Sequence, residues 1–257
     1  PPRLLPGTKS VVVFADSYWD PEGHDGKTVA KYACGKDYHK VLKDRIHLIF
    51  AALKKKIHGL KGRVCADSAP VLEHYWAQKA GVGWIGKHSL VITRRSGSYV
   101  YLGELFLDAD VAPDEEASLH CGTCRLCLDA CPTGAIVEPY VVDAGRCISY
   151  LTIEKREALT EDESRALGAH VFGCDICQDV CPWNHKENFL IQKKPADYGR
   201  RFDASELGEC GASEVAELLL CSDETDFSAR LSDTPLLRAG HAGIQRNLAA
   251  VQKNLGE

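Results

Sequence analysis

Two cysteine-rich runs lie in the middle of this 257-residue chain. The first, Cys121-Gly-Thr-Cys124-Arg-Leu-Cys127-Leu-Asp-Ala-Cys131-Pro132, matches the C-x2-C-x2-C-x3-C-P spacing of bacterial ferredoxins. In such a run three thiolates hold one [4Fe–4S] cluster and the fourth binds a second cluster. The second run, Cys174-Asp-Ile-Cys177-Gln-Asp-Val-Cys181-Pro182, has the same ending, but Val171 stands where its first cysteine would be. The two runs predict iron–sulfur chemistry, in which a protein passes single electrons.

Cys147, upstream of the second run, can supply the missing thiolate and completes a set of eight. We assign Cys121, Cys124, Cys127 and Cys181 to one cluster, and Cys131, Cys147, Cys174 and Cys177 to the other. A structural zinc site prefers two separated pairs of cysteines. A disulfide framework belongs to small secreted domains, and the sequence shows no secretory signal. Both alternatives explain the spacing less well than two iron–sulfur clusters.

The composition is that of a soluble globular protein, with 45% hydrophobic and 26% charged residues. No stretch approaches the roughly 18 apolar residues of a membrane span. The cysteine content without a targeting segment predicts a reducing, cytoplasmic location. The chain begins with Pro1 and contains no methionine, so we expect a fragment.

The residues before the cysteine runs predict a mixed set of strands and helices. Ser10–Ala15 is short, apolar and β-branched, which is typical of a buried strand. From Asp37 to Ile57 apolar residues recur at helical spacing with lysines between them, and Asp37 is the expected cap. Arg63–Ala66 is typical of a second strand. The sequence Asp67-Ser-Ala-Pro70 then predicts the start of a helix over residues 71–80.

The stretch Gly81-Val-Gly83-Trp-Ile-Gly86 matches the G-x-G-x-x-G pattern of dinucleotide-binding loops. That fingerprint follows a strand and opens a helix, whereas here it follows a helix and leads into strands. We therefore expect a loop that closely approaches another cofactor, and no NAD site. Next, Ser89–Thr93 and Tyr99–Leu107, joined by a turn at Ser96-Gly97, predict a β-hairpin.

The later part of the chain predicts two further regions. Asp108–Ser118 is an acidic connector and a natural domain boundary, and a helical insertion is expected around Glu154–Leu167, between the cysteine runs. The end of the chain, from Thr234 onward, has the pattern of one helical repeat of the HEAT type.

With these motifs in place, the chain resembles the epoxyqueuosine reductase family. Besides the cysteine runs, the resemblance is carried by Lys31-Tyr-Ala-Cys34-Gly-Lys-Asp37-Tyr38-His39, Asp67-Ser-Ala-Pro70-Val-Leu-Glu73, Ala80-Gly-Val-Gly-Trp84-Ile-Gly86-Lys87-His88-Ser89-Leu90, Leu102-Gly-Glu104-Leu and Arg146-Cys147-Ile-Ser149-Tyr150-Leu. It implies an α+β protein in which residues 1–115 form a cobalamin-binding α/β domain. Residues 116–192 would form a bacterial-type ferredoxin domain with two [4Fe–4S] clusters, and residues 193–257 a helical, HEAT-like region that binds tRNA. Family members carry a further N-terminal stretch, which we expect to be missing here.

The resemblance also implies the reaction, the reductive removal of the epoxide oxygen of epoxyqueuosine in tRNA to give queuosine. That reaction needs two electrons, which the clusters would pass to cobalamin, and a proton for the departing oxygen. Asp67, in the region matching the family's Cys-x-Asp-Ser-x-Pro, is the implied proton donor; from the pattern alone it would cap the next helix. To donate near neutral pH, Asp67 needs a raised pKa, which burial would provide. Glu73 is explained as a first-turn acid, and Glu104 as the mid-strand partner of a base.

The cofactor-binding residues implied by the resemblance are Cys34, Asp67, Trp84, Gly86, Lys87, His88, Ser89 and Ser149. Lys87, His88 and Ser89 would hydrogen-bond corrin amides. Trp84 could pack on the corrin ring or in the protein core, and Cys34 is equally well explained as a small buried residue.

Basic residues are gathered in parts of the chain, although its net charge is -5. From His24 to Arg63 there are eleven Lys or Arg against three Asp. A polyanionic tRNA is therefore expected to bind electrostatically, with a solvated helix face as the alternative for this run. The later basic residues expected to contact tRNA are Lys193, Lys194, Arg200, Arg201, Arg238 and Arg246.

We further expect a monomer that receives electrons from an external flavodoxin, ferredoxin or reductase and does not bind membranes. Other functions fit parts of the pattern. A cobalamin-dependent reductive dehalogenase shares the cofactors but carries an export signal, which is not seen here. A non-catalytic ferredoxin-type electron carrier leaves the residues before Cys121 unexplained, and a tRNA-binding scaffold with structural clusters would bind without turnover.

Overall fold

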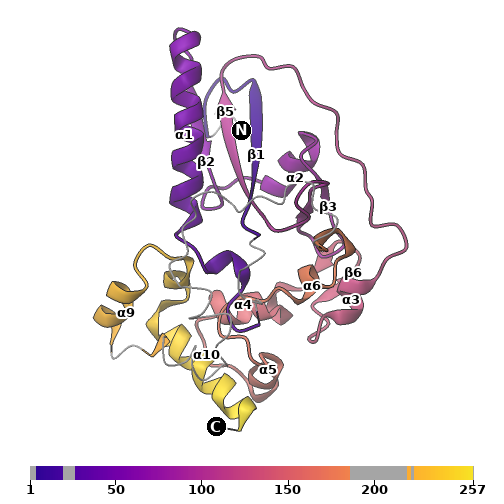
Figure 1. Cartoon of the computed structure of the whole chain (residues 1–257), viewed down its shortest axis with the longest axis vertical. Coiled ribbons are helices and arrows are strands. Elements are labelled where there is room, and N and C mark those ends of the chain that lie inside the picture. The colour runs from indigo at the N-terminus through magenta and orange to yellow at the C-terminus, as the bar shows by residue number, and fades with distance from the viewer. Residues whose placement is uncertain (1–3, 20–26, 186–218, 221–222, 257) are drawn as a thin grey trace.

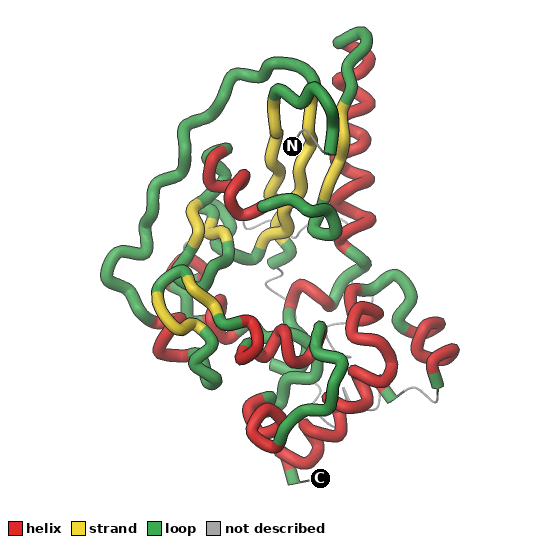
Figure 2. The backbone as a smooth tube through the Cα atoms, turned by 180° about the vertical axis from the view of Figure 1, so that it is seen from behind, coloured by secondary structure: helices red, strands yellow, loops and turns green. Residues whose placement is uncertain are grey.

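A computed structural model describes residues 4–19, 27–185, 219–220 and 223–256. The predicted tRNA contacts Lys193, Lys194, Arg200 and Arg201 lie outside the described residues. Figures 1 and 2 show the N-terminal part of the chain in a sheet at one end of the molecule and the C-terminus among helices at the other. Within the described ranges, no helix has the length and apolar character needed to cross a bilayer.

A three-stranded antiparallel sheet forms the end of the molecule that carries the N-terminus (Figure 1). Its strand order is β1-β5-β2, with bounds Ser10–Ser17 for β1, Val100–Leu107 for β5 and Gly62–Cys65 for β2. The central strand β5 pairs antiparallel with both neighbours, so that Glu104 lies between Val13 of β1 and Cys65 of β2. The strands predicted before and after the first helix are therefore both present.

The long helix α1, Tyr38–Lys56, lies along the sheet (Figure 1). It begins where predicted, because the Asp37 side chain accepts the backbone N–H of His39 at 3.0 Å. Its buried residues Leu42 and Ile46 pack against the sheet in one apolar cluster. Three lysines occupy its last turn, where positive charge is favourable beside the C-terminal end of the helix dipole.

The hairpin predicted over residues 89–107 is wrong. The short strand β4, Val91–Ile92, pairs with β3, Trp84–Ile85, and β5 pairs with strands from elsewhere in the chain. The glycine-rich loop before β3 allows β3 and β4 to come close enough to pair. A Cβ atom on Gly83 would collide with the carbonyl oxygen of Ile92, so Gly83 allows a close approach to the protein's own backbone.

The connector after β5 leads without regular structure along α2, Glu73–Lys79, toward the first cysteine run (Figure 1). It is fastened to that helix, because Glu116 pairs with Lys79 at 2.5 Å and the Ala117 N–H bonds to the Gln78 carbonyl at 3.0 Å. These contacts hold the acidic segment against the protein surface.

The region of the cysteine runs consists of short elements separated by turns. Their bounds are α3 Leu126–Ala130, β6 Ile136–Glu138, β7 Val141–Val142, α4 Ile148–Ile153, α5 Glu161–Ala166 and α6 Ile176–Asp179. Helix α5 falls within the predicted insertion. Its start is a capping box, in which Thr160 and Glu163 each bond the other's backbone N–H.

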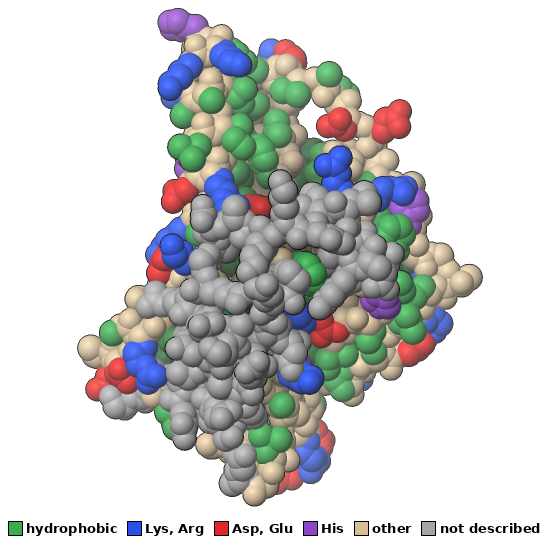
Figure 3. All heavy atoms as spheres, viewed as in Figure 1, with side chains coloured by type: hydrophobic (Ala, Val, Ile, Leu, Met, Phe, Trp, Pro, Cys, Tyr) green, Lys and Arg blue, Asp and Glu red, His purple; other side chains and the backbone are tan. Residues whose placement is uncertain are grey.

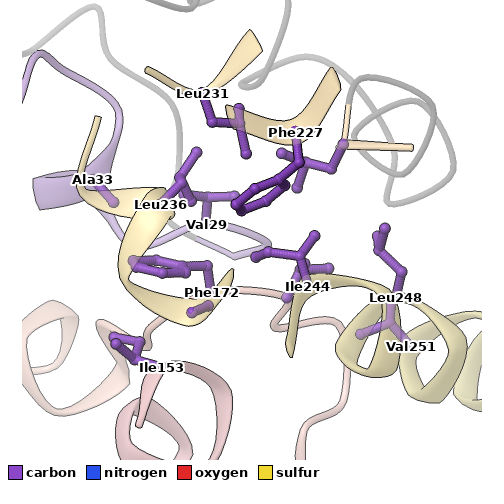
Figure 4. Packing of buried hydrophobic residues seen from close by; sticks show 13 residues of the cluster. Val29, Ala33, Ile153, Phe172, Phe227, Leu231, Leu236, Ile244, Leu248 and Val251 are labelled. Atoms are coloured by element: carbon purple, nitrogen blue, oxygen red, sulfur yellow. The ribbon is translucent and has the colours of Figure 1, made fainter. Parts of the chain in front are cut away.

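One apolar core joins the three regions predicted from the sequence (Figure 4). The C-terminal elements are α9 Glu224–Arg230, the 3-10 helix η5 Pro235–Ala239 and α10 Gly240–Leu255. From them, Phe227, Leu236 and Ile244 meet Phe172 of the cysteine region and Val29 of the N-terminal region. Val29 and Phe172 are also linked by a parallel β-bridge. The C-terminal helices are thus packed into the rest of the protein.

Candidate active site and cluster sites

The seven cysteines of the runs and Cys147 surround two separate hollows. Cys121, Cys124, Cys127 and Cys181 line the smaller one, and Cys131, Cys147, Cys174 and Cys177 line a cavity of about 460 Å³. These sets are the two that the spacing predicts. No three His, Cys, Asp or Glu side chains in the described part of the chain converge closely enough for a single metal ion. A [4Fe–4S] cluster is larger than a single ion, so its four cysteines surround it and do not converge on one point.

The larger cavity lies between the cysteine region and the sheet domain. Besides the four cysteines it is lined by aromatic side chains, including Tyr32, Tyr38 and Tyr101, and by the carboxyl group of Asp67. The ring of Tyr38 stacks on that of Tyr101 at 4.4 Å, with 1° between the ring planes. One cavity therefore joins a predicted cluster site to the predicted acid.

Asp67 lies two residues after the end of β2 and does not cap α2. That helix begins at Glu73 with Leu72 as its cap, so the helix-cap alternative for Asp67 is wrong. Its carboxylate instead accepts the hydroxyl of Tyr38 and contacts His39 Nε2 at 2.9 Å. The backbone of Asp67 has a φ of 53°, in the left-handed region that non-glycine residues seldom occupy. Such strain is found at functional sites, where the surroundings hold it in place.

The pKa of Asp67 is opposite to the expected one. The hydrogen bond with His39 is the largest cause and holds the pKa of Asp67 below its ordinary value, against the opposing effect of burial. The same bond raises the pKa of His39, whose Nδ1 contacts Asp37 at 2.7 Å. Burial raises the pKa of Tyr38, so the Tyr38 hydroxyl keeps its proton and donates a hydrogen bond to the Asp67 carboxylate. The contact between His39 and Asp67 therefore favours the ionised form of Asp67 and the protonated form of His39.

His88 lines both hollows and therefore lies between the two cluster sites. Burial lowers its pKa to about 4, which leaves the ring neutral. Its Nδ1 accepts the Leu90 N–H at 3.2 Å, so Nε2 carries the proton. That buried Nε2 has no hydrogen-bond partner among the described residues. A donor left in this position fits a bound group with acceptor atoms, such as a cluster sulfide or a cofactor amide.

The other predicted cofactor residues divide into two groups. Asp67, His88, Ser89 and Ser149 line the larger cavity. Lys87 does not, because its Nζ donates to the carbonyls of Gly122 and Cys124, at 2.7 Å each, and fixes the loop of the first run. Gly86 packs tightly against Ile92 and His88, and the Cys34 thiol bonds to the Ala30 carbonyl at 3.5 Å beside the apolar core.

Trp84 is buried, with 1% of its surface exposed, and does not line the larger cavity. Its ring packs edge-on against His120 at 4.8 Å and Trp183 at 4.7 Å, in an apolar cluster with Cys121 and Cys181. Of the two roles considered for Trp84, packing in the core is the one observed, and it supports the first cluster site.

The two described arginines predicted to contact tRNA differ in availability. Arg238 has 67% of its side chain exposed and forms a two-pronged ion pair with Glu154, at 2.9 Å for each bond. Arg246 bonds inward to the carbonyls of Leu151, Lys155 and Glu157 and to the Asn247 side chain. These bonds occupy all its donors, which argues against the predicted tRNA contact of Arg246. The basic last turn of α1, Lys54–Lys56, is exposed (Figure 3).

Replacing Arg246 with Ala is expected to lower the free energy of unfolding by about 1–3 kcal/mol, because buried carbonyls lose their donors. Chemical unfolding of the anaerobic protein measures this loss. Arg238→Ala is the matched control, since an exposed ion pair contributes about 0–1 kcal/mol. Wild-type stability of Arg246→Ala together with weakened tRNA binding would restore the predicted contact.

Several neighbours of Asp67 were given no part in the site from the sequence. Tyr38 and His39 hold the Asp67 carboxylate, and Glu73 accepts the Asp67 backbone N–H. Glu104 does not pair with a base as expected, because the charged group that acts on it is Glu73. The Asp37-Tyr38-His39 sequence at the start of α1 was the available signal, since it places three polar groups at one helix end.

The class of protein follows from this geometry together with one family comparison. Residues 120–184 match the family described as a 4Fe-4S double cluster binding domain. The chain is therefore an iron–sulfur protein with sites for two clusters, one of which adjoins a cavity that contains an acid.

The family follows from the wider comparisons. Residues 1–68 match the family described as epoxyqueuosine reductase QueG, DUF1730. The epoxyqueuosine reductase of Xanthomonas campestris pv. campestris is 41% identical over 261 residues, which cover 97% of this chain and 70% of that protein. Epoxyqueuosine reductase from Streptococcus thermophilus has a TM-score of 0.85 at 27% identity, covering 100% of this chain and 67% of that one. An epoxyqueuosine reductase structure with an epoxyqueuosine-modified tRNA-Tyr stem loop has a TM-score of 0.80 at 30% identity, covering 98% and 66%. The chain belongs to the epoxyqueuosine reductase family, as predicted.

Proposed function

We propose that this chain reduces epoxyqueuosine in tRNA to queuosine, with Asp67 as the group that protonates the departing epoxide oxygen. The observation that carries the proposal is the shared cavity, which has four cluster cysteines in one wall and Asp67 in another. Electrons and a proton can thus reach one bound substrate from two sides. Family membership supports the same reaction.

We further propose that this cavity forms part of a cobalamin site. Its walls are largely aromatic and apolar, and the orphaned Nε2–H of His88 offers a donor to a polar group of the ligand. Tyr32, Tyr101, His88, Ser89 and Ser149 would hold it against the cysteine region. When bound, cobalamin supplies a metal centre that accepts electrons one at a time and reacts with carbon. The cysteine region, in this proposal, forms the two-cluster ferredoxin domain.

The chain's own residues manage the proton. The raised pKa of His39 favours its protonated form, and its two ring nitrogens contact Asp67 and Asp37, so it can return a proton to Asp67 after each turnover. Tyr38 keeps its hydroxyl proton and orients the carboxylate. Asp67 thus acts as the acid that meets the substrate, while the proton is stored on His39. Water exclusion by the bound tRNA strengthens each of these interactions.

The remaining parts of the proposal concern partners. The exposed lysines of α1 and Arg238 would contact tRNA phosphates in this proposal, and the charge of Arg238 also lowers the pKa of Asp67. The C-terminal helices form the proposed HEAT-like binding region. The first cluster is farther from the acid and would receive electrons from an external flavodoxin, ferredoxin or reductase. We propose a cytoplasmic monomer.

The test is turnover by the anaerobically reconstituted protein, supplied with cobalamin, a chemical reductant and a stem loop carrying epoxyqueuosine. Mass spectrometry of the nucleosides is expected to show queuosine, and omission of cobalamin should abolish it. Binding of the stem loop without turnover would instead support a scaffold. Release of halide from a halogenated phenol, with no queuosine formed, would support a reductive dehalogenase.

A further inference from the structure

Two carboxyl groups near Asp67, those of the buried Glu104 and the half-buried Glu73, have no part in the proposed proton transfer. Glu104 lies in the middle of β5, and its exposed fraction is 0%. No N–H or O–H group of the described residues donates a hydrogen bond to either of its carboxyl oxygens. An ionised carboxylate in such surroundings is strongly unfavourable, because it has lost its water and gained no donor.

The group that acts on Glu104 is a second carboxyl, that of Glu73 in the first turn of α2. Burial raises the pKa of Glu104 to about 8, and the charge of Glu73 and a hydrogen bond with it add to the effect. Burial likewise raises the pKa of Glu73 to about 7. Two carboxyl groups can share a hydrogen bond only when one of them carries a proton. Near neutral pH the pair therefore holds one proton. Glu104 carries that proton because it ionises less readily than Glu73.

The surroundings of the pair contain few other charges. Asp67 and His39 act on Glu73, while Cys65 of β2 lies opposite Glu104. On the other side of Glu104, Val13 of β1 is apolar. From α1, the side chains that reach this part of β5 are the apolar Leu42 and Ile46, which approach Gly103. The charged groups that act on Glu104 are the carboxyl groups of Glu73 and Asp67, and no cation of the described residues forms a hydrogen bond or ion pair with it.

Glu73 is also the support of the strained Asp67 backbone. Its Oε1 accepts the Asp67 N–H, and a charged acceptor makes such a bond stronger than a neutral one does. Tyr38 and His39 fix the other end of the residue, at the carboxylate. Asp67 is therefore held at both its backbone and its side chain, and the left-handed φ of 53° depends on the backbone bond.

We propose that Glu73 and Glu104 form a positioning pair for Asp67, in which Glu104 keeps the shared proton and the Glu73 carboxylate fixes the Asp67 backbone. The inference rests on the proposed function, because Asp67 is the acid that meets the substrate there. When Glu104 loses its proton, two buried negative charges face each other and Glu73 is driven away from the Asp67 N–H. Asp67 then leaves its left-handed conformation, and turnover falls.

The first test is the pH profile of Glu104→Gln. Titration of one group near pH 8 should make wild-type kcat about tenfold lower at pH 9 than at pH 7. Glutamine stays neutral and can still donate to Glu73, so the variant should lose most of this alkaline fall. Glu73→Gln keeps the size of the side chain but removes its charge. This variant should lower kcat by a larger factor than it changes KM. The matched control is Glu116→Gln, an exposed acid beside the same helix, which should keep the wild-type profile.

The second test needs no substrate. Infrared difference spectra of the substrate-free holoenzyme should show a protonated carboxylic acid at neutral pH that disappears as the pH rises through about 8. The band should be missing from Glu104→Gln, with iron content as the check on folding. Persistence of the band in that variant, or a wild-type alkaline fall in its kcat, overturns the positioning pair. A wild-type protein that shows the band but never forms queuosine contradicts the proposed function and supports the shared proton.

Discussion

Replacing Asp67 with Asn is expected to reduce the rate of queuosine formation about 100- to 10,000-fold, the usual loss when a positioned acid is removed. Asparagine keeps the shape of the side chain and can still accept the Tyr38 hydroxyl, but it cannot carry a proton from His39 to the substrate. Single-turnover assays with a reduced enzyme measure the chemical step directly. Iron and cobalamin content should be unchanged, because Asp67 is a ligand of neither.

The control for this prediction is Asp110→Asn, which changes an exposed aspartate that is paired with Lys9 at 2.9 Å and does not line the cavity. It should have no effect on the rate. Turnover of Asp67→Asn at the wild-type rate would show that the proton comes from another group. Tyr38 and His39 would then be the next residues to test, since both contact the same carboxylate.

Replacing Cys147 with Ala should reduce the iron content from about eight to about four atoms per chain and abolish turnover. Cys147 lines the larger cavity with three other cysteines, and three thiolates hold a [4Fe–4S] cluster less firmly than four. The first cluster has its own four cysteines around the smaller hollow and should assemble. Iron analysis and the electron paramagnetic resonance signal of the reduced protein report the loss.

Cys65→Ala provides the control for thiol removal. Cys65 is a buried cysteine in β2 that lines neither hollow, so its loss should leave all the iron in place. Full iron content in Cys147→Ala would contradict the partition of the cysteines. A loss of all iron would mean that the two clusters assemble only together.

Local patterns in the sequence predicted the structural features that depend on residues close together in the chain. The cysteine spacing predicted two cluster sites, and the helical spacing after Asp37 predicted α1 almost to the residue. The motif around Asp67 placed the acid on the cavity. Each of these features is fixed by a few adjacent residues, whose chemistry can be read in order along the chain.

What the sequence did not predict depends on long-range pairing. The hairpin was wrong because β5 finds its partners in β1 and β2 and not in the adjacent β4. Glu73 and Glu104 each had an adequate local explanation, and only the fold of β5 against α2 shows that they interact. Arg246 looked free for tRNA because the three carbonyls that it binds are about 90 residues away.

The core that joins Val29, Phe172 and Ile244 has a consequence for how the protein is made. A ribosome releases the chain from its N-terminus, so Val29 emerges long before the residues that cover it. The wall of the larger cavity beside Cys174 can close only after α10 has been synthesised. We therefore expect the cluster at that wall to be loaded after synthesis of the chain, and before then the nascent chain exposes the apolar surface that α10 covers.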